Sequence, residues 1–120
     1  MFEKLLSTLL TSRDQAHIFH LQTNSYAQHR ALNEYYTKIV DIIDSLAESY
    51  QGKYGIITNY SAPKQFDNID DTDVVKYFKA LAKFTEKTYD KIEQDPFLLS
   101  QLEVLIEFLY TTVYKLERLQ

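Results

Sequence analysis

The positions of glycine and proline constrain this 120-residue chain more than any other sequence feature. There are only two of each, Gly52, Gly55, Pro63 and Pro96, and all four lie between long segments in which apolar residues recur at helical spacing. A sheet protein of this length needs many more turn residues. The pattern therefore predicts an all-α chain, and the length fits one domain over residues 1–120 with a single core.

The first half of the chain predicts two long helices joined by a tight turn. The first is expected over Phe2–Gln22, with a break near Ser12 as the alternative, because Ser12 and Gln15 have capping-box spacing. The second should begin after the N-cap Ser25 and end at Gly52, which tolerates a left-handed stop. The expected core residues are Phe2, Leu5, Leu6, Leu9, Ala16 and His20, then Leu32, Tyr35, Ile39, Ile42, Ile43, Leu46 and Tyr50.

The second half predicts a long connection followed by two more helices. The connection runs from Gly52 to about Ile69, a third helix should begin within residues 70–73, and a fourth at Pro96 with Asp95 as N-cap. A long connection lets the third helix run parallel to the second, so we expect an up-down four-helix bundle. Its core residues are Val74, Phe78, Leu81, Phe84 or Thr85, and Ile92, then Leu98, Leu102, Leu105, Leu109, Val113 and Leu116.

Composition excludes several partners and chemistries. The formal net charge is -4, and the 13 basic residues are scattered, so we expect no nucleic-acid partner. No segment approaches the roughly 18 uncharged apolar residues of a membrane span, and no signal peptide is evident, so a cytoplasmic protein without a membrane partner is predicted. Cysteine is absent, so any metal site must use histidine, carboxylate or tyrosine ligands.

Polar residues of the second predicted helix gather on the side well away from its apolar stripe. At about 100° per residue they fall within roughly one quadrant of the helix. They are His29, Asn33, Asp44 and Glu48. His17 lies one turn before the end of the first helix and could approach them across the turn, whereas His20 lies closer to the core. Such a face is either solvated, which is the ordinary interpretation, or covered by another subunit.

The spacing of these residues resembles the Dps mini-ferritins of the ferritin-like superfamily. The ferroxidase pattern of that family is His, eleven residues, His, three residues, Asp, ten residues, Asp, three residues, Glu. The same register, with no insertion or deletion, here gives His17, His29, Asn33, Asp44 and Glu48. The resemblance therefore covers residues 17–48 and implies a ferritin-like four-helix bundle.

The resemblance also implies a homo-oligomer, a dimer or larger, that binds iron at a site shared between two subunits. Histidines of one subunit and the Asp44 and Glu48 of its partner would hold the metal, with zinc or another divalent ion as a substitute. His20, three residues after His17, could serve as a further ligand or as a packed histidine. The implied activity is ferroxidase oxidation of iron or its sequestration.

The residue at position 33 keeps a second hypothesis open. Asn33 stands where the family has Asp, which removes one negative charge and one strong oxygen ligand. Ile18 also stands where the family typically has tryptophan after the first histidine. The alternative is a non-enzymatic helical structural or interaction protein, such as a small phage or bacterial assembly component, with a degenerate metal site.

Overall fold

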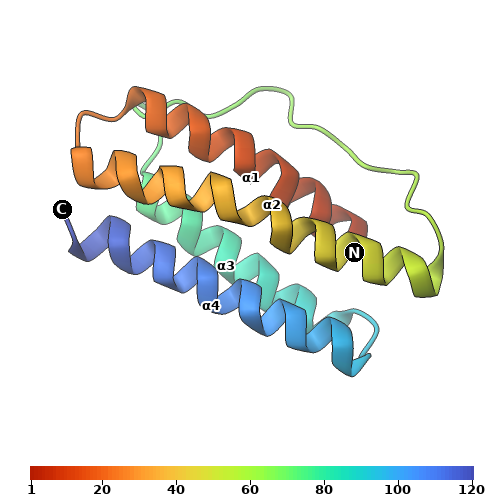
Figure 1. Cartoon of the computed structure of the whole chain (residues 1–120). Helices are drawn as coiled ribbons and strands as arrows, with labels where there is room; N and C mark the ends of the chain where they lie inside the picture. The colour runs from red at the N-terminus through yellow and green to blue at the C-terminus, as the bar shows by residue number, and fades with distance from the viewer.

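The computed structural model describes residues 1–120 and contains four helices and no strand. The helices are α1 (Phe2–Gln22), α2 (Tyr26–Tyr54), α3 (Val74–Lys91) and α4 (Pro96–Arg118). Figure 1 shows α1 and α2 running in opposite directions, α3 running in the direction of α2, and α4 returning antiparallel to α3. The predicted all-helical fold with four helices is confirmed.

One hydrophobic core lies between the four helices. Each helix packs against two others: α1 and α4 both contact α2 and α3, and α1 touches α3 least. The core is a cluster of 23 buried apolar residues that includes every position predicted for α4. Of the residues predicted for α1 and α2, His20, Ile42 and Tyr50 are only half-buried.

Helix α1 is continuous, so the alternative of a break near Ser12 is wrong. Ser12 is fully buried, and its hydroxyl donates to the carbonyl oxygen of Leu9 at 2.7 Å. The same hydroxyl lies 2.7 Å from the hydroxyl of Tyr35, whose side chain is also completely buried. Burial raises the pKa of Tyr35 well above its usual range, so this phenol stays neutral. The polar residue is in the core because it satisfies that phenol.

Helix ends differ from the prediction where tertiary contacts extend them. The stop predicted at Gly52 is wrong, because α2 continues to Tyr54 and leaves the helix at Gly55, where φ is 97°. Lys53 and Tyr54 both bond the carboxylate of Asp95, which holds this last half-turn in place. Asp95 precedes Pro96 at the start of α4 as predicted, but its side chain binds α2 instead of capping its own helix.

The connection over residues 55–73 is an ordered strap that runs back along α1, as Figure 1 shows. The side chain of Gln15 in α1 is buried and forms hydrogen bonds with both backbone groups of Asp67 in the strap. Its amide nitrogen donates to the carbonyl oxygen at 2.9 Å, and its amide oxygen accepts from the backbone N–H at 2.8 Å. The Ser7 hydroxyl accepts from the N–H of Ser61 at 3.0 Å. Polar side chains of α1 therefore satisfy these backbone groups of the strap.

Helix α4 is long and apolar enough to cross a membrane by length and composition alone. Glu103 and Glu107 interrupt the segment, so it is not the run of roughly 18 uncharged apolar residues on which the sequence-based prediction rests. In the folded chain the apolar stripe of α4 faces the shared core, as expected of a core helix.

The Ser12 and Tyr35 pair generates a stability prediction. Ser12→Ala should lower the free energy of unfolding by about 1–3 kcal/mol, because it leaves the Tyr35 hydroxyl buried without a partner. Tyr35→Phe should lower it by less than about 1 kcal/mol, because Ser12 keeps its bond to Leu9. The double variant should match Tyr35→Phe. Urea unfolding of the three variants measures this, and equal losses for both single variants would contradict it.

Candidate functional site

All three histidines of the chain gather with a tyrosine where α1 ends and α2 begins. The rings of His20 and His29 stack, with centroids 3.6 Å apart and planes 18° apart. His17 stacks on Tyr36 with centroids 4.3 Å apart, and it lies 5.8 Å from the ring of His20. The tight turn therefore brings His17 and His20 of α1 beside the first turns of α2. We call these three histidines and Tyr36 the histidine corner.

His20 and His29 also hold each other through their backbones. The Nδ1 atom of His20 lies 2.8 Å from the carbonyl oxygen of His29, and the Nδ1 atom of His29 lies 2.9 Å from the carbonyl oxygen of His20. A carbonyl oxygen only accepts, so each Nδ1 carries the proton. In a neutral ring, this tautomer leaves Nε2 unprotonated and with a free lone pair. Nε2 is then the atom that binds a metal, because Nδ1 donates to the carbonyl.

One of these bonds also caps a helix. The carbonyl oxygen of His20 lies in the last turn of α1, where no further turn supplies a backbone N–H. The Nδ1–H of His29 donates to it in place of that missing partner. His29 is therefore half-buried and turned toward α1, although its neighbours on the same polar face are exposed.

A cleft of about 370 Å³ opens beside the corner. It is lined by His20, Tyr26, His29, Arg30, Asn33 and Glu34. Asn33 is exposed, and its side-chain oxygen accepts from the Tyr36 hydroxyl at 2.6 Å. Glu34, the only carboxylate in the lining, binds Lys115 of α4 at 2.7 Å, and this bond lowers its pKa. The one acidic group at the cleft is thus already paired.

Asp44 and Glu48 do not join the histidine corner within one chain. Both are exposed on α2, and Asp44 lies fifteen residues beyond His29, or about 22 Å along the helix axis. The chain alone contains no group of three histidine or carboxylate side chains placed to hold one ion. The structure therefore gathers four of the six predicted site residues, His17, His20, His29 and Asn33, and leaves the two carboxylates apart.

The donor types at the corner suit a divalent metal, but the stacked rings do not yet converge on one. Imidazole nitrogen is a good ligand for iron or zinc. The lone pair of Nε2 lies in the plane of its ring, and two nearly parallel planes 3.6 Å apart do not meet at bonding distance from both atoms. A single ion shared by His20 and His29 would require the stack to open.

The neighbours Tyr26, Arg30 and Glu34 were not predicted as parts of the site. Tyr26 lies over His29 with ring centroids 6.3 Å apart, and the guanidinium of Arg30 lies 5.9 Å from the Tyr26 ring. Only their sequence positions, within the first turns of α2 around His29, could have indicated them. Arg30 adds positive charge to the cleft, which weakens its attraction for a cation unless carboxylates arrive from elsewhere.

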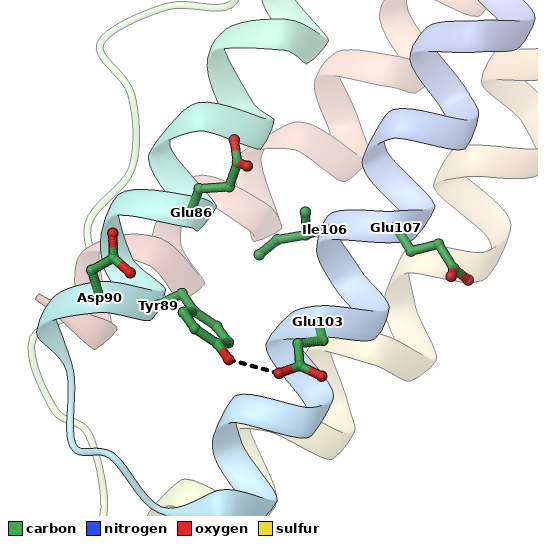
Figure 2. A pocket seen from close by; sticks show the side chains of 6 residues that line it. All are labelled: Glu86, Tyr89, Asp90, Glu103, Ile106 and Glu107. Carbon is green, nitrogen blue, oxygen red and sulfur yellow. Dashed lines mark hydrogen bonds between the residues drawn. The ribbon is translucent and has the colours of Figure 1, made fainter.

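A second cleft, of about 420 Å³, lies between α3 and α4. Its lining is acidic and consists of Glu86, Tyr89, Asp90, Glu103, Ile106 and Glu107. Figure 2 shows the Tyr89 hydroxyl donating to Glu103, at 2.6 Å, while the Glu107 carboxylate points away from α3. No histidine lines this cleft, and its carboxylates do not converge on a point. The histidine corner is therefore the stronger candidate site.

Comparison with known sequences gives a family and one relative. Residues 20–116 match the family of unknown function DUF5856. The chain is also similar to an uncharacterised 14.6 kDa protein in the mobD-ri intergenic region of Enterobacteria phage T4. The two are 26% identical over 119 residues, which cover 95% of this chain and 86% of the phage protein. No solved structure matches the chain.

The histidine corner generates a second stability prediction. His29→Ala should lower the free energy of unfolding by about 1–2 kcal/mol, because it removes the donor to the carbonyl oxygen of His20 and the ring stack. His17→Ala is the matched control and should lower it by less than about 0.5 kcal/mol, since that ring is exposed and makes no hydrogen bond. Chemical denaturation compares the two, and equal effects would show that the bond from His29 Nδ1 to the carbonyl oxygen of His20 contributes nothing.

Proposed function

The chain belongs to the DUF5856 family, and we propose that it is a ferritin-like, Dps-like homo-oligomer that binds iron or a similar divalent metal between two copies. The observation that carries the proposal is the pair of histidines whose Nδ1 atoms are held by backbone carbonyls. Metal-binding histidines in proteins are usually oriented in this way. The single long crossover between α2 and α3 is a further feature that ferritin-like bundles have.

The carboxylates must come from a second copy, because one chain keeps Asp44 about 22 Å and Glu48 about 28 Å from His29 along the helix axis. If two α2 helices pack antiparallel, a single register places Glu48 opposite the partner copy's His29 and Asp44 opposite its Asn33. Both pairs have the same midpoint in the sequence, between Lys38 and Ile39. One two-fold interface could therefore complete two sites at once, one on each side of its axis.

The residues of the chain would have different ligand roles at such a site, set by their chemistry. His17, His20 and His29 offer neutral nitrogen ligands that fix geometry, while Asp44 and Glu48 offer the negative charge that offsets the ion. Asn33 can supply a neutral oxygen in place of a carboxylate. Bound iron would supply redox chemistry, and oxidation or sequestration are the two functions that follow from it.

A second candidate is a helical structural or interaction protein that does not use metal. The stacking of His20 on His29 favours it, because the reciprocal bonds already give both rings a structural role. The similarity to an uncharacterised phage protein is compatible with a small phage component of either kind. Metal content and solution mass distinguish the two candidates.

The test is elemental analysis of protein purified without chelator and then loaded with ferrous iron or zinc, together with its mass by light scattering. We expect about one or two metal ions per chain in a dimer or larger assembly. Glu48→Ala should remove most of the metal without changing stability, because Glu48 is exposed and makes no bond within the chain.

Glu107→Ala is the matched control, because it removes an equally exposed carboxylate from α4. It should leave the metal content unchanged. Absence of metal at every loading, or equal metal content in Glu48→Ala and the unsubstituted protein, would overturn the metal proposal and leave the structural candidate.

A further inference from the structure

The least tightly packed junction in the chain is the one between α1 and α3, beneath the strap. Two clefts line it and share Thr8 and Tyr77 as common walls. The first has a volume of about 310 Å³ and the second about 180 Å³. Because they share these two side chains, the clefts are adjacent, and together we call them the α1–α3 groove, with a larger and a smaller half. None of its lining residues belongs to the histidine corner.

The larger half of the groove is polar and carries one cation. Hydroxyl groups come from α1, α3 and the strap, and Lys4 is the only charged side chain in the lining. Lys4 forms no ion pair within the chain. Ser7 accepts from the N–H of Ser61, which leaves its own hydroxyl hydrogen free to donate. The Thr8 hydroxyl already donates to the Lys4 carbonyl oxygen, so this half offers a positive charge and the free Ser7 hydroxyl donor.

Tyr77 stands at the junction of the two halves. Burial raises the pKa of its phenol above the usual range, and the nearby Asp67 carboxylate raises it further, so the group stays protonated. The hydroxyl makes no hydrogen bond within the chain, although the Tyr77 ring packs edge-on against Phe19 at 5.6 Å. A neutral phenol held in this way is a donor without an acceptor.

The smaller half of the groove is apolar apart from Thr8 and Tyr77. Its other walls are Ala80, Leu81 and Phe84 of α3. Leu81 is buried and Phe84 packs against the core, so both are held in place, whereas Ala80 is exposed at the mouth. Small-molecule sites combine such an apolar surface with a few convergent polar groups.

We propose that the α1–α3 groove binds an amphipathic monocarboxylate, with its carboxylate at Lys4 and Ser7 and its hydrocarbon tail along Ala80, Leu81 and Phe84. A single negative charge matches the single lysine of the lining, and a carboxylate oxygen can accept from the free Ser7 hydroxyl. The apolar half gives the tail a surface that a sugar or a free phosphate would leave uncovered. This site involves none of the histidines, so its test is independent of the test of metal binding.

The probe is decanoate, titrated into the full chain by calorimetry and by NMR, with decanol and acetate as comparison ligands. We expect decanoate to bind, with shifts at residues of the α1–α3 groove, and acetate and decanol to bind at least about tenfold more weakly. Lys4→Gln should weaken decanoate binding about tenfold or more, while Lys64→Gln, an exposed strap lysine outside the lining, should not change it.

Ala80→Trp tests the tail, because it fills the mouth of the apolar half from an exposed position that the core does not use. It should abolish decanoate binding while helicity and the unfolding midpoint stay unchanged. The proposal is overturned if decanoate does not bind the unsubstituted protein, or if Lys4→Gln and Ala80→Trp both bind it as the unsubstituted protein does. Equal binding of decanol and decanoate would overturn the assignment of the polar half.

Discussion

The antiparallel pairing of α1 with α2 is the constraint on which the rest of the chain depends. Specific contacts hold it at both ends and in the middle: Phe2 stacks on Tyr50 at 4.2 Å, Ser12 bonds Tyr35, and His20 stacks on His29. Leucines alone would tolerate sliding of one helix along the other, because apolar contact is non-directional. The hydrogen-bonded contacts are directional and buried or half-buried, so they fix the register.

With α1 held on α2, its remaining sides are free to receive the other elements. One side carries the strap, which is hydrogen-bonded to Gln15, and the neighbouring side makes only a few contacts with α3. The same pairing places the turn between the helices so that residues of α1 and α2 share the histidine corner. The strap, the α1–α3 groove and the corner are thus consequences of one packing arrangement.

The sequence was most informative where structure is local. The scarcity of glycine and proline and the leucine spacing of α4 predicted helices and a core stripe that the structure has. It was least informative where a polar residue serves a distant partner. Ser12 and Gln15 were interpreted as a possible capping box, because their partners are distant in sequence: Tyr35 lies 23 residues from Ser12 and Asp67 lies 52 residues from Gln15. Gly52 was predicted to end α2, because the contact of the last residues of α2 with Asp95 could not be predicted from the sequence.

In the candidate site, too, the sequence predicted local features but not the contacts between elements. The helical wheel predicted that Asn33, Asp44 and Glu48 lie away from the core, and all three are exposed. It could not predict that His29 turns inward to stack on His20, because that depends on where the turn places the end of α1. Spacing along one helix reports which residues share a face, whereas the contacts of those residues are set by the neighbouring elements.

Nitrogen NMR of the histidine side chains is the most direct measurement of the central claim, which is that the corner holds two imidazoles with Nδ1 engaged and Nε2 free. The spectra would be recorded at mildly alkaline pH on metal-free protein. We expect His20 and His29 both to show the Nδ1–H tautomer, with an unprotonated Nε2. The opposite tautomer in either ring, with the proton on Nε2 and none on Nδ1, would contradict the reciprocal carbonyl bonds and remove the basis for ligand binding at the corner.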